Sequence, residues 1–246
     1  PYVNSNNMIS KKKTKSNISR NITTVILCGG MGMRLRPLTN NIPKPLINIK
    51  NKPILYYIIK HLKKYQCDNF IIAAGYKSKK ICDYMKNNFK SLNYKIIDSG
   101  NVDILTRIKD SIKQTSKDTM VCYGDTISNV NIDNLIDFYG NINDKVIISS
   151  FPITIPFGVM EIDKKSNVMS FKEKPILREV MNIGYYYIPK NMHKYVLKQK
   201  DMLSMLANLT KYKKLRCFKH DGIHITVNTL NELSNAEQNI QGILKL

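Results

Sequence analysis

Short apolar runs alternate with amphipathic segments along most of the chain. Five runs have the length and composition of buried strands: residues 23–27, 69–74, 94–97, 119–123 and 145–151. Between them, apolar residues at helical spacing predict helices over residues 54–62, 77–89, 104–112 and 132–139. Strands that alternate with helices of this length predict right-handed βαβ units. The expected fold is α/β, with a Rossmann-like, mainly parallel or mixed sheet flanked by helices.

The pattern of apolar and polar residues differs before and after this alternating region. After Pro152, short apolar runs at 158–162, 168–172 and 183–188 predict a smaller antiparallel or mixed β portion in the C-terminal half. Residues 1–21 are dominated by Asn, Ser and Lys, so we expect a flexible basic tail there. Residues 22–246 are expected to form a single domain.

The chain is strongly basic. Its 39 Lys and Arg residues against 18 Asp and Glu residues give a formal net charge of +21. The lysines are scattered rather than gathered into a stripe with interleaved aromatic residues, so the charge does not predict nucleic-acid binding. It does favour small phosphorylated substrates.

Apolar content and cysteine spacing exclude other classes of protein. No apolar run approaches the roughly 20 residues of a membrane-spanning helix, and the first residues lack the apolar stretch of a secretory signal. The five cysteines contain no Cys-x-x-Cys pair, which argues against a disulfide framework or a zinc site. We therefore expect a cytoplasmic protein with no membrane partner.

The most informative segment is residues 28–39 (CGGMGMRLRPLT), which directly follow the first predicted strand. Gly29, Gly30 and Gly32 permit positive φ and a close approach of the backbone, so successive N–H groups can cradle phosphate oxygens. Arg34 adds a bidentate donor for the same anion. A simple tight turn is the alternative, because the spacing matches neither the Walker pattern nor the dinucleotide-binding pattern.

The longer segment 25–49 (VILCGGMGMRLRPLTNNIPKPLINI) resembles the signature of the sugar-1-phosphate nucleotidyltransferase family, GGxGxRLxPLT followed by PKPL. Further family motifs follow in order: AAGY at 73–76, YGD at 123–125, FG at 157–158, EKP at 173–175 and NIG at 182–184. The resemblance spans residues 23–240 of this sequence. Residues 123–132 (YGDTISNVNI) look most like the cytidylyltransferases of the family.

The resemblance implies a reaction in which an acceptor phosphate oxygen attacks the α-phosphorus of a nucleoside triphosphate, with CTP favoured, and pyrophosphate leaves. The protein must then neutralise and align two anions. By family position, Arg34 stabilises the pyrophosphate, Lys44 reaches the triphosphate and Lys174 holds the acceptor phosphate. Asp125 follows a predicted strand, at the edge where an α/β sheet opens its crevice, and is the expected ligand of Mg²⁺.

The motifs also assign the binding residues. The predicted nucleotide-binding residues are Cys28, Gly29, Gly30, Met31, Gly32, Arg34, Gly75, Ser99, Gly100 and Gly124. The predicted acceptor-binding residues are Glu173, Lys174, Asn182 and Gly184. The predicted catalytic set is Arg34, Lys44, Asp125 and Lys174, and the predicted metal ligands are Asp125 and Asn228.

One departure from the family lies near the C-terminus. Family members carry an Asp-Thr pair that completes the Mg²⁺ site, preceded by an aromatic residue, whereas this chain has Asn228-Thr229 with His224 at the aromatic position. Asn binds Mg²⁺ through its carbonyl oxygen but supplies no charge. Two interpretations stay open: an active enzyme with a weaker metal site, for which Asp221 compensates, or a catalytically weak relative that binds nucleotide and regulates a partner.

A second departure lies in residues 99–110, where relatives that act on sugars carry a Gly-Gly-Arg segment. Here Leu105 and Thr106 precede Arg107, which predicts a changed or smaller acceptor pocket. The acceptor is then a sugar 1-phosphate or another phosphate monoester, such as a phosphorylated amino acid or amino alcohol. Uridylyl, guanylyl and thymidylyl transfer stay open beside cytidylyl transfer, and so does a homo-oligomer.

The four histidines fit no metal-ligand spacing. We expect His61 and His193 to be surface or packing residues. His224 is the one that could line the site.

Overall fold

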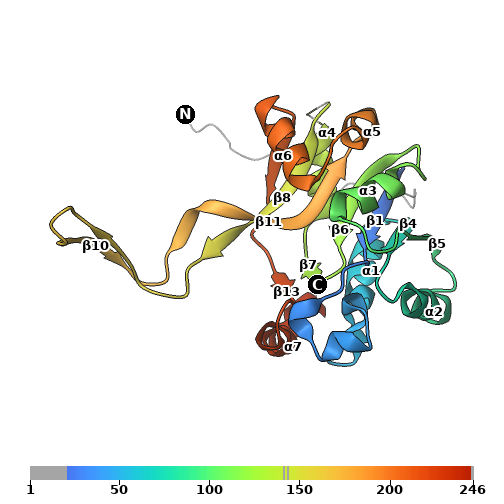
Figure 1. Ribbon diagram of the computed structural model, residues 1–246, viewed down its shortest axis with the longest axis horizontal. Helices are drawn as coiled ribbons and strands as arrows, with labels where there is room; N and C mark the ends of the chain where they lie inside the picture. Colours follow the sequence, from blue (N-terminus) through green and yellow to red (C-terminus); the bar gives the residue numbers. More distant parts are fainter. Residues whose placement is uncertain (1–20, 141, 143, 245–246) are drawn as a thin grey trace, which may run out of the picture.

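The computed structural model describes residues 21–140, 142 and 144–244. The expectation of a flexible tail therefore falls almost wholly outside the described residues. Within them the chain forms a layered α/β domain from which one long ribbon projects (Figure 1). No helix in the described part of the chain is long and apolar enough to cross a membrane.

A seven-stranded sheet forms the centre of the domain. Its strands lie in the order β12 (Leu215–Lys219), β8 (Val146–Thr154), β11 (Ile176–Ile188), β6 (Asp118–Tyr123), β1 (Ile22–Leu27), β4 (Asn69–Ala74) and β5 (Asn93–Asp98). Only β11 runs against its neighbours β6 and β8, while the other pairs in this sheet are parallel. The predicted α/β fold with a mainly parallel sheet is confirmed.

Helices cover both faces of this sheet. They are α1 (Ile54–Lys64), α2 (Ser78–Asn88), α3 (Ile104–Ile112), α4 (Ile132–Gly140), α5 (Lys190–Leu197), α6 (Met202–Lys211) and α7 (Leu230–Leu244). Side chains of β1 alternate between two cores, with Ile26 packing among residues of α1, α2, α4 and α7 and Val25 among residues of α3, α5 and α6. The alternation of a strand thus places a separate apolar core on each face.

Helix α1 follows closely from its sequence. Its apolar residues at positions i, i+1, i+4, i+5 and i+8, from Ile54 to Leu62, are all buried, and this spacing gives a single apolar face. Pro53 is the N-cap of this helix, with extended φ and ψ. Pro53 also ends the short strand β3 (Lys52–Pro53), which pairs with β2 (Asn48–Ile49).

Short elements after the strands position the polar residues. Three 3-10 turns, Met33–Leu35, Leu38–Asn40 and Lys44–Leu46, carry the chain from β1 to β2. Beyond β6, strand β7 (Thr126–Ser128) pairs antiparallel with β13 (His224–Thr226). This pairing brings the segment after residue 226 against the segment before residue 126.

The C-terminal β portion is an extended ribbon. Strands β9 (Val159–Ile162) and β10 (Val168–Lys172) form an antiparallel hairpin, as the sequence predicts. The predicted strand 183–188 is only the second half of the 13-residue strand β11. The first half pairs with the end of β8 outside the body of the domain (Figure 1), and its exposed residues hide it from a search for buried runs.

Candidate functional site

A glycine loop follows β1 at the edge where the parallel strands end. The backbone N–H of Cys28 donates to Ala73 O at 2.8 Å and that of Gly124 to Leu27 O at 3.0 Å. A Cβ on Gly124 would lie 2.4 Å from Leu27 O, so only glycine permits this approach of the two loops. The loops after β1, β4 and β6 therefore meet at one edge of the sheet, where α/β proteins bind ligands.

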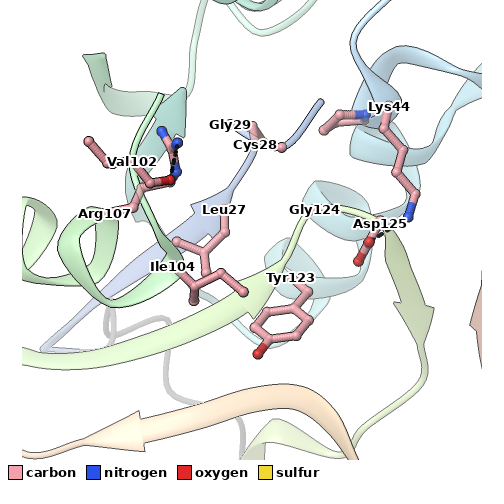
Figure 2. A pocket seen from close by; sticks show the side chains of 12 residues that line it. Leu27, Cys28, Gly29, Lys44, Val102, Ile104, Arg107, Tyr123, Gly124 and Asp125 are labelled. Atoms are coloured by element: carbon pink, nitrogen blue, oxygen red, sulfur yellow. Dashed lines mark hydrogen bonds and ion pairs between the residues drawn. The ribbon is translucent and has the colours of Figure 1, made fainter. Parts of the chain in front are cut away.

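A cavity of about 190 Å³ lies at this edge, lined by the segments after β1 and β6 and by the start of α3 with the residues before it (Figure 2). Its lining residues are Leu27, Cys28, Gly29, Gly30, Lys44, Pro45, Val102, Ile104, Arg107, Tyr123, Gly124 and Asp125. Besides Lys44, five predicted catalytic or nucleotide-binding residues line the cavity: Cys28, Gly29, Gly30, Gly124 and Asp125. Figure 2 shows Arg107 and Val102 on one side of the cavity and Lys44 and Asp125 on the other, with Cys28 and Gly29 of the glycine loop between them.

A charged centre lies at one side of this cavity. Lys44 Nζ donates to Asp125 Oδ2 at 2.6 Å and to Asn228 Oδ1 at 2.7 Å. Arg34 Nη2 donates to the same Asn228 oxygen at 3.0 Å. The side chain of Lys44 is 10% exposed and that of Asp125 33%, so the pair is partly shielded from water. Three separate segments of the chain thus bring two cations, a carboxylate and an amide together.

Local structure explains how Lys44, Asp125 and Asn228 reach this centre. Lys44 begins the third 3-10 turn after Pro43, and its buried stem is held by the fold of that turn. Asp125 lies between β6 and β7, and its backbone oxygen accepts from Val227 N at 3.4 Å. Asn228 follows β13, and its own backbone N–H donates to the Glu232 carboxylate. The β7–β13 pairing therefore sets the distance between Asp125 and Asn228.

Arg107 is a site residue that the motifs did not assign. Its guanidinium is buried at the cavity wall and donates to the carbonyl oxygens of Ala74, Gly100 and Val102. Burial lowers its pKa, although Asp98 and other carboxylates oppose this shift. Arg107 thereby ties the loop after β4 to the loop before α3. The signal in the sequence is a charged residue on the otherwise apolar face of a predicted helix.

The glycines at this wall leave room for Arg107. A Cβ on Gly29 would lie 2.0 Å from Arg107 Cζ, and one on Gly75 would lie 2.7 Å from Arg107 Nη1. A Cβ on Gly75 would also lie 2.6 Å from Gly100 O. Gly29, Gly75 and Gly100 thus belong to one packed wall of the cavity, which leaves room for the guanidinium of Arg107.

The remaining predicted nucleotide-binding residues lie beside the cavity rather than in its lining. Gly32 has φ of 62°, and its carbonyl oxygen accepts from Thr39 Oγ1 at 2.9 Å, so it shapes the loop. Met31 is 36% exposed. Ser99 Oγ is buried and has no hydrogen-bond partner among the described residues.

The predicted acceptor residues are not brought to the cavity. Glu173, Lys174 and Asn182 are exposed on the projecting ribbon, and none of them lines the cavity. Lys174 N donates to Phe157 O at 3.2 Å. Gly184, with φ of 77°, lies directly against the ring of Tyr123. A Cβ at residue 184 would lie 2.4 Å from Tyr123 Cγ. The acceptor roles of these residues stay predictions.

The expectation that Leu105 and Thr106 fill the pocket is wrong. Leu105 is buried in the core beneath α3, together with Val25. Thr106 faces Asp103, whose side chain caps the helix by accepting from Thr106 N at 3.1 Å. Because successive helical residues point in different directions, only Ile104 and Arg107 of this helix reach the cavity.

The histidines serve packing. His193 is buried, and its Nε2 lies 3.1 Å from Thr119 Oγ1. His61 Nε2 lies 2.9 Å from Val130 O, and burial lowers its pKa to about 4. His224 packs against Phe151 with ring centroids 5.2 Å apart, and burial lowers its pKa to about 4 as well. His224 is absent from the cavity lining.

Comparison with known proteins agrees with the motifs. The family model of nucleotidyl transferases matches residues 23–230. A protein of Bacillus subtilis (strain 168) named "Probable glucose-1-phosphate cytidylyltransferase" is 28% identical over 235 residues, covering 85% of this chain and 92% of the relative. The D-glycero-alpha-D-manno-heptose 1-phosphate guanylyltransferase of Campylobacter jejuni is 29% identical over 198 residues, covering 78% and 87%.

A solved structure shows the same fold. HddC from Yersinia pseudotuberculosis superposes with a TM-score of 0.69 at 23% identity, over 89% of this chain and 99% of that one. The family model spans most of the described domain, and the glycine loop and the Lys44–Asp125 centre lie within it. This chain therefore belongs to the nucleotidyl transferase family and is a nucleotidyltransferase.

Proposed function

We propose that this chain transfers a nucleotidyl group from a nucleoside triphosphate, CTP being favoured, to a small phosphorylated acceptor, with Mg²⁺ as cofactor and release of pyrophosphate. The observation that carries the proposal is the charged centre of Lys44, Arg34, Asp125 and Asn228 beside a cavity walled by a glycine loop. A triphosphate needs cations and backbone donors at one place, and this arrangement offers both.

The side chains of Asp125 and Asn228 suit a divalent cation. Both oxygens contact the same ammonium group, that of Lys44, at 2.6 and 2.7 Å, so they already converge on a positive charge. Mg²⁺ at nucleotide sites is typically held by one or two protein side chains together with phosphate oxygens and water. Bound there, the ion would supply charge neutralisation on the phosphates.

The chain's own residues bind and orient the reactants. Lys44 is a compact cation that can follow phosphate oxygens, and Arg34 offers two parallel donors to the leaving pyrophosphate. The glycine-loop N–H groups fix the triphosphate so that the acceptor oxygen attacks the α-phosphorus opposite the leaving group. Burial raises the pKa of the Cys28 thiol, which keeps it protonated and unreactive, so direct transfer needs no covalent intermediate.

Two lines of support bear on the nucleotide. Residues 123–132 are similar to the corresponding segment of cytidylyltransferases, and the relative from Bacillus subtilis carries that name. The relative from Campylobacter jejuni is named a guanylyltransferase. CTP is therefore the favoured donor, with GTP, UTP and dTTP as the competing donors in the test.

A phosphate monoester is the proposed acceptor. Both relatives are named for sugar 1-phosphates, which makes a hexose or heptose 1-phosphate the first choice. A phosphorylated amino acid or amino alcohol is the second candidate acceptor, because the side chains of Ile104 and Arg107 narrow the cavity beside the glycine loop.

The test is release of pyrophosphate, with each nucleoside triphosphate crossed against hexose, amino-sugar and heptose 1-phosphates, phosphocholine and phosphorylated amino acids. The proposal expects release that requires Mg²⁺ and is strongest for CTP with one acceptor. If pyrophosphate release is strongest with another nucleoside triphosphate, the proposed donor is wrong but the proposed nucleotidyl transfer stands.

A second candidate is a catalytically weak relative that binds nucleotide and regulates a partner. The observation that favours it is Asn228, which supplies an uncharged amide oxygen at a position where the resemblance to the family implies an aspartate. This candidate predicts that CTP raises the melting temperature while no acceptor in the panel supports pyrophosphate release.

A further inference from the structure

Tyr76 holds the glycine loop, residues 28–39, at two points. Its backbone N–H donates to Gly29 O at 3.1 Å, and its hydroxyl donates to Thr39 O at 2.8 Å. Gly29 lies at the start of the loop and Thr39 at its end. A single residue that follows β4 therefore fastens both ends of the loop that follows β1.

A second hydrogen bond carries this support to the middle of the loop. Thr39 is buried, and its Oγ1 donates to Gly32 O at 2.9 Å. A Cβ on Gly32 would lie 2.9 Å from Thr39 Cγ2 and 3.2 Å from Lys44 Cβ, so these three residues are in close contact. The position of Thr39 therefore determines how near the loop lies to the turn that begins with Lys44.

The loop between these two ends keeps its own backbone donors unpaired. The N–H groups of residues 30–32 donate to no backbone oxygen within the described part of the chain. Successive N–H groups of this kind can bind an anion, provided that the turn keeps its shape without using them. The bonds from Tyr76 and Thr39 all end on carbonyl oxygens of the loop, so they fix its shape and leave these N–H groups free.

Tyr76 is itself held by its neighbours. It follows Gly75, against which the guanidinium of Arg107 packs, and Arg107 also donates to Ala74 O. On the ring of Tyr76, Lys77 Nζ lies 5.1 Å from the centroid, which is a cation–π distance. Residues 74–77 therefore connect the wall that contains Arg107 to the glycine loop.

Leu35 anchors the same loop in a different way. Its side chain is fully buried and lies in the first 3-10 turn, Met33–Leu35. Burial of an apolar side chain holds a segment against the core without fixing its orientation, whereas a hydrogen bond is directional. Loss of the Tyr76 hydroxyl should therefore leave the loop attached to the domain but less precisely shaped.

We propose that Tyr76 is a positioning residue for nucleotidyl transfer, which holds the glycine loop in the shape that binds the phosphates of the donor nucleotide. Its effect on nucleotide binding rests on the proposed function, whereas its bracing of the loop rests on the hydrogen bonds alone. Tyr76 does not line the cavity, so it acts through the loop. A loop that is already in shape aligns the triphosphate without first having to be ordered.

Two phenylalanine variants test this role. Tyr76→Phe keeps the ring beside Lys77 and removes only the hydroxyl. Tyr57→Phe is the matched control, because the Tyr57 hydroxyl donates to Ile49 O, also at 2.8 Å, and Tyr57 does not line the cavity. Each variant loses one hydrogen bond from a tyrosine to a carbonyl oxygen, so the urea midpoints of both are expected to fall. Only Tyr76→Phe is expected to change nucleotide binding.

Steady-state kinetics separate positioning from stability. With the nucleoside triphosphate that gives the strongest pyrophosphate release, Tyr76→Phe should raise the nucleotide KM about fivefold, the effect of losing one neutral hydrogen bond. Its acceptor KM should stay within about twofold of the wild type, as should both KM values and kcat of Tyr57→Phe. An unchanged nucleotide KM in Tyr76→Phe, or an equal rise in both variants, would overturn the positioning role.

Amide hydrogen exchange without substrate keeps the bracing testable even if no acceptor supports turnover. Exchange in residues 28–40 should be severalfold faster in Tyr76→Phe than in the wild type, because local opening of the loop becomes easier. The N–H of Leu35, which donates to Gly32 O at 2.9 Å, reports on this opening. In Tyr57→Phe the faster exchange should fall in residues 47–53 instead. Wild-type exchange in the loop of Tyr76→Phe would overturn the bracing.

Inorganic pyrophosphate with Mg²⁺ is a probe that does not depend on the base. Calorimetry should show binding to Tyr76→Phe that is about fivefold weaker than binding to the wild type or to Tyr57→Phe. Equal affinities in the three proteins would overturn the role of Tyr76 in phosphate binding. A wild type that bound no pyrophosphate and turned over no nucleotide would overturn the proposed function and this role with it, while faster exchange in the loop of Tyr76→Phe would still establish the bracing.

Discussion

The guanidinium of Arg107 lies so close to Gly29 that a Cβ on that glycine would fall 2.0 Å from Arg107 Cζ. The glycine loop therefore needs a residue without a side chain at this position for a packing reason, besides the phosphate binding that we propose for this loop. The carbonyl oxygens of Ala74, Gly100 and Val102 hold the guanidinium in place, so it has little freedom to move aside.

Gly29→Ala should therefore destabilise the protein by about 1–3 kcal/mol, the usual cost of overpacking. Urea unfolding measures this loss. Gly30→Ala is the matched control, since a Cβ on Gly30 meets no atom within 4 Å, and its effect should stay within about 0.5 kcal/mol. In an Arg107→Ala background the Gly29→Ala cost should shrink, because the clashing group is gone. Equal costs in both backgrounds would contradict this packing account.

Asn228→Asp should raise activity at low Mg²⁺. The Asn228 oxygen accepts from both Lys44 and Arg34, so a carboxylate there meets two cations and adds a charged oxygen for a divalent ion. The measurement is pyrophosphate release as a function of Mg²⁺ concentration, in which half-maximal activity should move severalfold lower. Asn228→Ala, which keeps neither oxygen nor charge, should shift the same curve to higher Mg²⁺.

Acid should destabilise the fold through buried histidines. Burial lowers the pKa of His61 to about 4, whereas an unfolded histidine titrates near 6.5. Between these values the unfolded chain binds more protons, so the free energy of unfolding falls as pH falls from about 6.5 to 4. The full contribution of His61, reached below pH 4, is on the order of 3 kcal/mol.

Substitution of His61 distinguishes its contribution to the pH dependence of stability from that of the other titratable groups. His61→Gln can keep a donor to Val130 O, with which His61 Nε2 is hydrogen-bonded, and carries no titratable ring. Urea midpoints of this variant should therefore decline less between pH 7 and pH 5 than those of the wild type. A decline of equal size in both proteins would show that His61 is not a source of the pH dependence.

The sequence predicts most of the fold because its periodicities are strong where both faces of the sheet are covered. Strand β4 and helix α3 appear at their predicted limits, since each is bounded by turn residues and buries one or two apolar faces. The first half of β11 is missed because most of its residues are exposed on the projecting ribbon. Its pairing with β8 is a non-local contact that no local pattern records.

The nucleotide side of the site is likewise predictable from the sequence. The loop after β1 and Asp125 lie at strand ends, so topology alone brings them together. The structure brings the predicted residues Lys44 and Asn228 to Asp125. Arg107 is missed because its role depends on packing against glycines in two other loops. The absence of Lys174 from the cavity lining could not be predicted, because it depends on how the ribbon between β8 and β11 projects from the domain (Figure 1).

The most direct test of the central claim is kcat/KM for Mg²⁺-dependent pyrophosphate release in variants of the charged centre and of one exposed Lys–Asp pair. Asp125→Ala and Arg34→Ala should each lower kcat/KM about a hundredfold or more, on the order of 3 kcal/mol of transition-state stabilisation. The exposed Lys63–Asp68 pair supplies the control, and Asp68→Ala should leave kcat/KM within about twofold of the wild type, because exposed pairs contribute little. Wild-type turnover in both Asp125→Ala and Arg34→Ala would contradict the assignment of this centre as the site of nucleotidyl transfer.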